Sequence, residues 1–310
     1  MGDGWRARTT THAEELGTTW ADLRVGSETA RLTDVLLTWP GERLAFEGAP
    51  GAWLMHARPD LARMREEATG LADAYTADGV RVHWLQPRGA DDGADGGPDP
   101  LPNLVFARDL LFMTPEGAVL ARMAAQQRAG EERAAAMALA ALGVPILATP
   151  RGNATFEGAD ALWIRPGLVA VGTGRRTNAE GFALLQRVLA EQGVACVDVP
   201  LSPHVQHLLG SLNLVRDDLA VAREPGPGLL RLLDQHGIEA LALDPAEVAA
   251  SRANNFVTLS PGAVLMPGGC PRSRAILEAR GVRVVERPVT QYLCAAGGIG
   301  CATGILGRRA

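Results

Sequence analysis

Stretches of apolar residues, each interrupted by a short turn, recur four times along the chain. They occupy residues 111–120, 162–171, 212–221 and 256–265, and their starts are spaced by roughly 45–50 residues, a period typical of internal repeats. The interruptions contain Pro-Glu-Gly, Pro-Gly or Asp-Asp, which supply the backbone angles or the side-chain caps that tight turns require. We therefore interpret each stretch as two apolar strands joined in a β-hairpin.

A helix and a further short strand are predicted after every hairpin. The predicted helices span 131–142, 178–192, 228–236 and 273–280, and the strands that follow span 144–147, 194–198, 238–242 and 282–285. A glycine separates helix from strand in every copy, as expected for the left-handed residue that ends many helices. A fainter first copy combines a strand at 35–39, a helix at 60–78 and a strand at 80–84.

These five β-β-α-β units predict one α/β domain. Each unit has one apolar face, and all five faces are buried together if the units close around a common axis, with helices outside and loops converging at the centre. We expect the domain to span residues 26–310, after a flexible N-terminal segment of residues 1–25. The Gly-, Asp- and Pro-rich stretch 87–100 is predicted to be a surface loop.

The composition, with 47% hydrophobic and 21% charged residues, is typical of a soluble globular protein. No apolar run approaches the roughly 18–20 residues of a membrane span, and the polar N-terminus lacks a signal-peptide segment, so we expect a cytoplasmic protein. The net charge of -5 argues weakly against nucleic acid or an anionic membrane as a partner. All 30 basic residues are Arg, and the absence of Lys excludes both a pyridoxal phosphate Schiff base and a phosphate-loop lysine.

One of the four cysteines stands out as a candidate nucleophile. The four, Cys196, Cys270, Cys294 and Cys301, lack the paired spacing of a zinc site or a disulfide framework. Cys301 follows Gly297, Gly298 and Gly300, which let the backbone turn sharply and present amides beside the sulfur, and this favours a thiolate. A tight structural turn is the competing interpretation.

A thiolate nucleophile needs a histidine for proton transfer. His207 lies at the start of the hairpin 212–221, and His204 nearby is the fallback. Two acidic residues, Asp109 and Glu157, also precede hairpins, where carboxylates often do no more than cap a turn or face solvent. The four positions share one feature, however. Asp109, Glu157, His207 and Cys301 each lie where a repeat unit faces the predicted axis.

On these residues the chain resembles the pentein superfamily of guanidino-group-modifying enzymes, which comprises dimethylarginine dimethylaminohydrolases, arginine and agmatine deiminases, and amidinotransferases. The resemblance extends from about Leu32 to Gly304. Three segments resemble superfamily motifs, namely Pro102-Asn-Leu-Val-Phe-Ala-Arg-Asp109, Asn153-Ala-Thr-Phe-Glu-Gly-Ala-Asp160 and Val171-Gly-Thr-Gly-Arg-Arg-Thr-Asn178. His207 and Cys301 fall where the superfamily carries its histidine and its C-terminal cysteine. The implied fold is a five-bladed α/β propeller.

The resemblance also implies roles for these residues. Cys301 would attack the guanidinium carbon to give a covalent thiouronium intermediate, His207 would transfer protons, and Glu157 would orient His207. The implied substrate-binding residues are Asn103, Phe106, Asp109, Arg128, Asp160 and Arg176, of which Asp109 holds the guanidinium and the two arginines the substrate carboxylate. The partner is a small guanidino compound, and neither a metal nor an organic cofactor is required.

Departures from the superfamily pattern leave the reaction open. Deiminases and amidinotransferases usually carry His-x-Asp, but here the sequence is His207-Leu-Leu209. Dimethylarginine dimethylaminohydrolases lack that aspartate too, which favours a hydrolase that acts on an N-substituted or otherwise altered guanidine. The expected reaction is hydrolysis of arginine or an N-substituted, arginine-like molecule to a ureido product such as citrulline. Yet the segments around Asp109 and Cys301 are more similar to the deiminase and amidinotransferase side, and Gly300 replaces a histidine often found before the nucleophile. An amidinotransferase and a catalytically silent binding protein are therefore the alternatives, and the oligomeric state stays open, a homodimer being one option.

Overall fold

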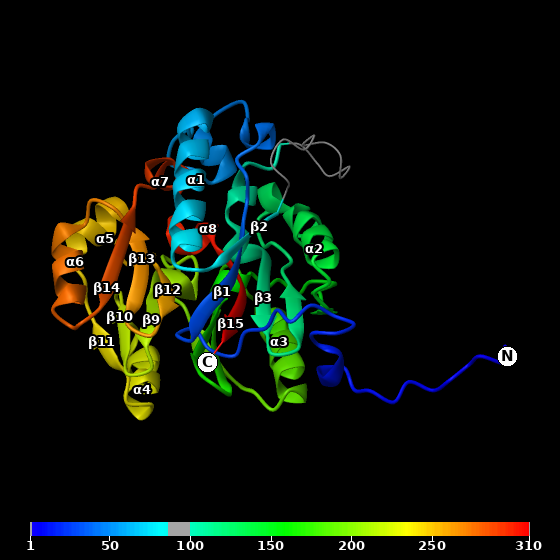
Figure 1. Ribbon diagram of the computed structural model, residues 1–310. Coiled ribbons are helices and arrows are strands. Elements are labelled where there is room, and N and C mark those ends of the chain that lie inside the picture. The colour runs from blue at the N-terminus through cyan, green and yellow to red at the C-terminus, as the bar shows by residue number, and fades with distance from the viewer. Residues whose placement is uncertain (1, 86–99, 310) are drawn as a thin grey trace.

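The computed structural model describes residues 2–85 and 100–309, which contain five three-stranded sheets. Neighbouring sheets contact each other directly or through the turns that precede them, so the five form a closed ring, and Figure 1 shows several of them side by side. The predicted loop at 87–100 lies, apart from Pro100, outside the described residues. The sheets are the blades of the predicted five-bladed α/β propeller, which is confirmed.

Four blades share one topology, in which an antiparallel hairpin is extended by a parallel third strand. The strands are β3 (Leu111–Thr114), β4 (Gly117–Leu120) and β5 (Ile146–Ala148); β6 (Ala161–Arg165), β7 (Leu168–Thr173) and β8 (Ala195–Pro200); β9 (Leu212–Arg216), β10 (Leu219–Ala222) and β11 (Glu239–Leu241); and β12 (Val257–Ser260), β13 (Ala263–Pro267) and β14 (Arg283–Arg287). The four predicted hairpins therefore form where the apolar pattern places them.

The first blade closes the ring with both ends of the chain. Strand β1 (Arg31–Leu37) pairs in parallel with β2 (Arg81–Trp84) and antiparallel with β15 (Gly304–Arg309), the last strand. The prediction of a self-contained β-β-α-β first unit is thus wrong in one respect, because its hairpin partner comes from the other end of the sequence. Since β15 follows Cys301 directly, closure of the ring also fixes the position of that residue.

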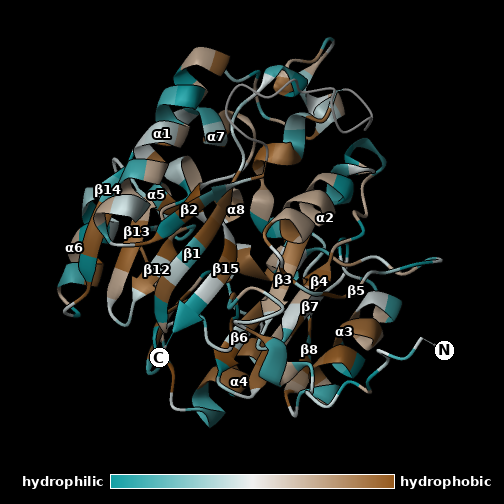
Figure 2. Ribbon diagram, turned by 45° about the vertical axis from the view of Figure 1, so that its right-hand side comes forward, coloured by the Kyte–Doolittle hydropathy of each residue, from teal (hydrophilic) through white to brown (hydrophobic). Residues whose placement is uncertain are grey.

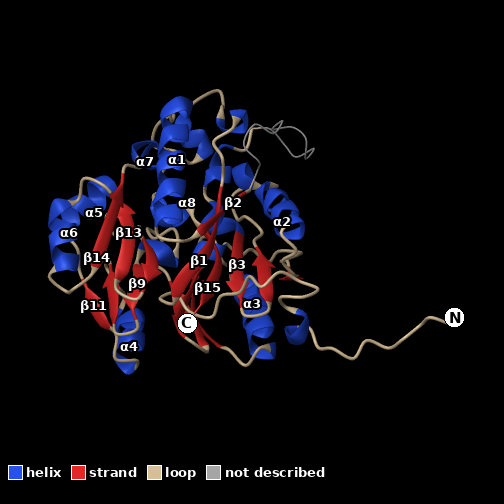
Figure 3. Ribbon diagram, viewed as in Figure 1, coloured by secondary structure: helices blue, strands red, loops and turns tan. Residues whose placement is uncertain are grey.

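One helix connects the second and third strands of each blade and lies on the outside of the ring (Figure 3). These helices are α1 (Leu61–Ala77), α2 (Glu131–Ala141), α3 (Ala179–Glu191), α4 (Pro227–Gln235) and α6 (Pro271–Glu278). The glycine that follows each of them has a positive φ between 66° and 79°, which an L-residue with a side chain adopts only at a cost. Further short helices are α5 (Pro245–Ser251), α7 (Thr290–Cys294) and α8 (Ile299–Ala302).

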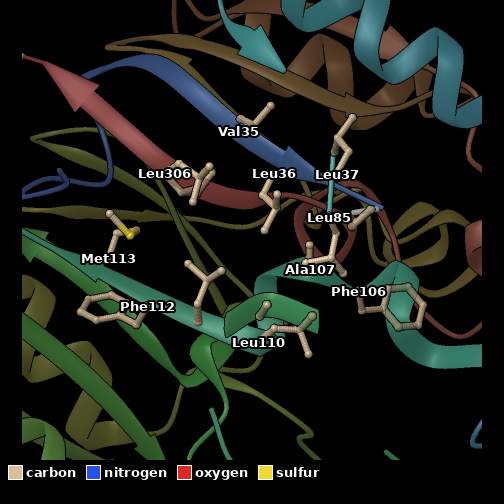
Figure 4. Packing of buried hydrophobic residues seen from close by; sticks show 14 of the residues in the cluster. Val35, Leu36, Leu37, Leu85, Phe106, Ala107, Leu110, Phe112, Met113 and Leu306 are labelled. Carbon is tan, nitrogen blue, oxygen red and sulfur yellow. The ribbon is translucent and has the colours of Figure 1, made fainter. Parts of the chain in front are cut away.

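The core lies between the strands and the outer helices, and both contribute hydrophobic residues to it, drawn in brown in Figure 2. Figure 4 shows Leu36 of β1 and Leu306 of β15 beside Phe112 of β3, where the first and second blades meet. These side chains are at most 4% exposed. Full burial of a large apolar side chain contributes about 1.5–3 kcal/mol, so the seam formed by the two chain ends is tightly held.

The N-terminal segment is partly attached to the domain. Of residues 1–25, those up to about Thr11 are exposed, but Leu23 and Val25 are buried. The backbone N–H of Ala21 donates to the carbonyl of Gly143, and that of Val25 to the carbonyl of Thr114. The part of the segment from Ala21 onward is therefore ordered against the second blade. No helix among the described residues is long and apolar enough to cross a bilayer.

Candidate active site

Loops from all five blades enclose a cavity of about 440 Å³. The predicted residues that line it are Asn103, Phe106, Asp109, Arg128, Arg176, His207 and Cys301, and the fallback His204 lines it as well. Glu157 and Asp160 do not line the cavity, although both are at most 1% exposed. The thiol and the imidazole predicted to act together thus face one enclosed space.

A turn precedes the first strand of each hairpin pair, and each such turn contributes one polar group to the site. Asp109 lies in the 3₁₀ helix Ala107–Leu110 before β3, and Glu157 lies just before the 3₁₀ helix Gly158–Asp160 that leads into β6. His207 precedes the 3₁₀ helix Leu208–Gly210 before β9, Asn255 stands two residues before β12, and Cys301 lies on α8 before β15. The five-fold repeat therefore places one side chain of the candidate site at the start of each blade.

The imidazole of His207 is held between two carboxylates. Its Nε2 is 2.7 Å from Oε2 of Glu157, and its Nδ1 is 3.9 Å from Oδ1 of Asp109. Burial disfavours the imidazolium, but the charge of Asp109 and the hydrogen bond to Glu157 outweigh it and raise the pKa of His207 to about 9. His207 is therefore protonated at neutral pH, ready to act as an acid.

Glu157 is fixed as an anion beneath the cavity. Its Oε1 accepts hydrogen bonds from the backbone N–H of Ala124 at 3.0 Å and from Nη1 of Arg176 at 3.3 Å. Burial alone would raise the pKa of this carboxyl, but His207, Arg128 and Arg176 lower it to about 2. Glu157 thus remains charged opposite His207 throughout the physiological range.

Arg128, which the resemblance implies as a substrate-binding arginine, is engaged with two protein carboxylates in this structure. Its Nη1 donates to Oδ2 of Asp109 at 2.6 Å, while Nε and Nη2 both donate to Oε2 of Glu131. The side chain is 2% exposed. Arg128 therefore orients Asp109, and a substrate carboxylate would have to displace one of these partners to reach it.

Asp109 keeps one oxygen without a donor. Oδ2 is bound by Arg128, but Oδ1 is buried and, within the described residues, accepts no hydrogen bond. A buried carboxylate oxygen left without a donor is unfavourable by about 1–3 kcal/mol, more for a charged group. Because Asp109 lines the cavity, a ligand with N–H groups can supply the missing donor.

Asp160 supports the histidine loop, although the resemblance implies a substrate contact for it. Its Oδ1 accepts a hydrogen bond from the backbone N–H of Leu208 at 3.1 Å, and Oδ2 accepts one from the hydroxyl of Thr177 at 2.7 Å. Burial raises the pKa of this carboxyl to about 7. From this position Asp160 anchors the residue next to His207.

Sequence reasoning missed Asn255, which contacts the candidate nucleophile directly. Its Nδ2 lies 3.3 Å from Sγ of Cys301, and its Oδ1 accepts a hydrogen bond from the backbone N–H of Cys301 at 3.2 Å. Asn255 is 3% exposed. The internal repeat could have revealed it, since Asn255 lies two residues before β12 just as Asp109 lies two residues before β3.

The glycines before Cys301 matter because they are small, and not because they adopt unusual backbone angles. None of Gly297, Gly298 and Gly300 has a positive φ, so the turn before Cys301 does not depend on left-handed backbone angles at these glycines. A Cβ at Gly297 would overlap the ring of Phe106, and one at Gly298 would lie 2.7 Å from Oδ1 of Asn255. Their small size lets two cavity side chains approach the turn that carries Cys301.

Asp109, Glu157 and His207 offer ligand atoms within 4.8 Å of one another, a spacing that would suit a metal ion. The group is already charge-balanced, because Nη1 of Arg128 lies 2.6 Å from Asp109 and 3.7 Å from Glu157, and His207 is itself protonated at neutral pH. A divalent cation would have to displace these positive charges. The donor set therefore fits a proton-transfer site better than a metal centre.

A five-bladed α/β propeller with thiol, imidazole and carboxylates gathered in its central cavity is the architecture of the pentein class. The arginine deiminase family matches residues 88–224. An uncharacterized protein of Aeropyrum pernix is 31% identical over 205 residues, which are 64% of this chain and 72% of that protein. An arginine deiminase of Rhodococcus erythropolis is 28% identical over 247 residues, 67% of this chain but only 61% of the relative.

Solved structures show the same fold. The dimethylarginine dimethylaminohydrolase of Pseudomonas aeruginosa, as a cysteine-to-serine mutant with citrulline, has a TM-score of 0.71 at 23% identity and covers 88% of this chain and 99% of its own. An amidinotransferase of the saxitoxin pathway from Microseira wollei has a TM-score of 0.77 at 18% identity, and the match covers 94% of this chain and 98% of the amidinotransferase. The chain belongs to the pentein superfamily of guanidino-group-modifying enzymes, whose deiminase and dimethylaminohydrolase members hydrolyse amidine C–N bonds.

Proposed function

We propose that the protein is a cysteine-dependent hydrolase that acts on the guanidinium group of arginine or an N-substituted, arginine-like small molecule. The products are a ureido compound such as citrulline and ammonia or an amine. The observation that carries this proposal is the convergence on one cavity of a thiol, a protonated imidazole and a buried carboxylate oxygen without a donor.

Recognition starts at Asp109. A guanidinium presents several N–H donors in one plane, and Oδ1 of Asp109 is the buried acceptor that lacks one. Arg128 holds the carboxylate in place through Oδ2, so little rotational freedom is lost when the substrate binds. The substrate therefore meets a carboxylate that is already oriented and partly desolvated.

Binding of the cation also favours ionisation of the nucleophile. Burial, followed by the charge of Asp109, raises the pKa of the Cys301 thiol, whereas Arg252 and the hydrogen bonds from the backbone of Gly298 and from Asn255 lower it. A guanidinium bound at Asp109 neutralises the charge of that carboxylate, which is the second cause of the raised thiol pKa, and adds a positive charge beside the sulfur. The thiolate forms most readily when substrate is present.

Bond changes then follow in two stages. The sulfur of Cys301 donates an electron pair to the guanidinium carbon, and the resulting tetrahedral adduct expels one nitrogen as the C–N bond breaks. His207 donates the proton that this leaving nitrogen needs, and a thiouronium remains. Water then adds to the same carbon and gives one proton to His207. The C–S bond breaks to regenerate the thiolate, the remaining hydroxyl proton passes to the released ammonia or amine, and the neutral ureido product leaves.

An amidinotransferase is the second candidate, since an acceptor amine in place of water leaves every other step unchanged. His207-Leu-Leu209 lacks the aspartate that amidinotransferases and deiminases usually carry, as dimethylarginine dimethylaminohydrolases do, and this resemblance to the last group favours hydrolysis. The absence of any amine requirement would support the hydrolase, whereas turnover only with added amine would support the transferase.

The test is a product assay on purified protein with arginine, methylated arginines and agmatine, in which ammonia, alkylamine and ureido product are measured. We expect a ureido product without added amine, and loss of turnover by at least about 1,000-fold in Cys301→Ser with unchanged thermal unfolding. Cys196→Ser is the matched control, because Cys196 is also half-buried but lies on β8 and does not line the cavity. Turnover by Cys301→Ser at wild-type rates would overturn the proposal.

A further inference from the structure

A second cavity adjoins the central one where the third and fourth blades meet. It has a volume of about 420 Å³ and is lined by β8 of the third blade and the first half of α4 of the fourth, and we call it the side cavity. Four residues line both cavities, namely Ser202, Val205, Ser211 and Glu224. The two cavities therefore share one wall, although none of the residues that line the side cavity takes part in the proposed hydrolysis.

The side cavity is apolar inside and charged only where it meets solvent. Aliphatic residues line much of it, among them Val197, Val199, Leu201, Leu229 and Leu232, which belong to or pack against one hydrophobic cluster. The charged residues of the lining are all exposed, namely Asp198, Glu224 and Arg231. An apolar group suits this space, because each methylene that leaves water strengthens binding by up to about fourfold.

The wall that the two cavities share belongs to the segment that carries His207. Ser202 and Val205 precede His207 by five and two residues, and Ser211 follows it by four. The N–H of Val205 donates to the carbonyl of Ser202 at 2.9 Å, which forms a turn between β8 and the imidazole. Under the proposed mechanism His207 gives its proton to the nitrogen that leaves, so this nitrogen lies on the side of the site where the shared wall stands.

We propose that the side cavity is the subsite for an apolar substituent on the leaving nitrogen. Asp109 holds the guanidinium, Cys301 attacks its carbon, and the substituent extends past Val205 and Ser211 into the side cavity. An arginine alkylated on Nω then reacts with water to give citrulline and a primary alkylamine. The subsite rests on the proposed function and narrows it to guanidines whose leaving amine carries an apolar group of several carbons.

The experiment uses arginine with an ethyl, a butyl or a hexyl group on Nω, and citrulline and alkylamine are measured for each. We expect kcat/KM to rise by roughly 10- to 100-fold from the ethyl to the hexyl compound, because four more methylenes leave water while the longer chain loses rotational freedom. Hydrolysis of arginine together with a flat or falling alkyl series would leave the proposed function standing and overturn the subsite.

Gly228 is the position at which the side cavity can be filled. It is the second residue of α4 and lines the side cavity, and a Cβ added there meets nothing within 4 Å. In Gly228→Trp the ratio of kcat/KM for the hexyl compound to kcat/KM for the ethyl compound should fall to about one or two, since the indole occupies the space that the longer chain needs. Both rates come from one protein, so a general loss of active enzyme leaves the ratio unchanged.

Two variants serve as controls. Gly228→Ala should keep the wild-type ratio, because a single methyl group leaves most of the side cavity open. Gly51→Trp should also keep it: Gly51 likewise follows a proline at the second position of a helix, the 3₁₀ helix Pro50–Trp53, its Cβ meets nothing within 4 Å, and it lines neither cavity. A wild-type ratio in Gly228→Trp, or an equal fall in all three variants, overturns the subsite.

A binding assay separates this inference from the proposed function. If the wild type hydrolyses none of the guanidines, the proposed function fails, but calorimetry with ethylguanidine and hexylguanidine on the Cys301→Ser protein still tests the subsite. Tighter binding of hexylguanidine, lost in the Cys301→Ser/Gly228→Trp double variant, supports it. Equal binding of the two compounds overturns it.

Discussion

Replacing Asn255 with Ala should raise the pKa of the Cys301 thiol. The substitution removes the Nδ2 donor 3.3 Å from Sγ and the Oδ1 acceptor of the Cys301 N–H, in a place that is 3% exposed and offers little water in exchange. A hydrogen bond to a charged group contributes about 1.5–3 kcal/mol, and one pKa unit corresponds to about 1.4 kcal/mol, so the expected rise is about 1–2 units. Asn255→Asp should raise the thiol pKa further, because it replaces the donor with a negative charge.

The assay is the pH dependence of alkylation by iodoacetamide, with the signal of the other three cysteines subtracted by use of the Cys301→Ser protein. Asn254→Ala is the matched control. Asn254 is also buried, and its Nδ2 donates to the carbonyl of Gly210 at 2.9 Å, but it makes no hydrogen bond to the thiol. If the Asn255→Ala and Asn254→Ala proteins titrate at the same pH as the wild type, Asn255 does not stabilise the thiolate and the reasoning is refuted.

Two further predictions concern the proton and the space around the nucleophile. Folding raises the pKa of His207 to about 9, so its stabilising contribution is complete below the unfolded value of about 6.5 and is lost as pH rises through about 9. Glu157→Gln should lower the pKa of His207. Urea unfolding should then show a smaller loss of stability between about pH 6 and about pH 9 in the variant than in the wild type. An equal loss would show that Glu157 does not stabilise the protonated form of His207. Gly297→Ala forces a Cβ against the ring of Phe106 and should lower the free energy of unfolding in urea by about 1–3 kcal/mol. The control is Gly51→Ala, whose Cβ meets nothing within 4 Å and which should change the free energy of unfolding by less than about 1 kcal/mol. Equal effects of the two alanines would contradict the close-packing argument.

Local signals account for the parts of the fold that the sequence predicts correctly. The hairpin turns and the glycines at 79, 143, 193, 237 and 281 are short-range features, and each reports its own conformation wherever the chain goes afterwards. The partner of β1 was missed because pairing of Val35 with Ile305 joins the two ends of the chain, and no turn marks such a contact in the sequence. Ring closure is a property of the whole repeat array rather than of any one segment.

The candidate site likewise contains residues that the sequence predicts and others that only the structure reveals. Asp109, Glu157, His207 and Cys301 are chemically conspicuous at repeat openings, so periodicity and residue type together were enough to select them. Asn255 occupies an equivalent opening but is an uncharged amide, and only its two contacts with Cys301 distinguish it from a turn-forming asparagine.

The role of Arg128 required coordinates for a different reason. An arginine near a predicted anion-binding cavity is equally consistent with binding ligand or binding protein, and only coordinates could show that Arg128 contacts Asp109 and Glu131. Its binding of a substrate carboxylate stays a prediction.

These contacts form a chain of buried charges whose order explains the site. Glu131 holds Arg128, Arg128 holds one oxygen of Asp109, and Asp109 in turn faces His207, which is bound to Glu157. Buried ion pairs of this kind contribute little net stability, because desolvation offsets most of their attraction, so their value lies in fixed orientation. The chain ends at the cavity with Oδ1 of Asp109, which accepts no hydrogen bond from a described residue. Under the proposed function, a cation bound there would offset the charge of Asp109, which after burial is the second cause that raises the pKa of the Cys301 thiol. Under the proposed function, the same carboxylate would select the substrate and couple its arrival to activation of Cys301.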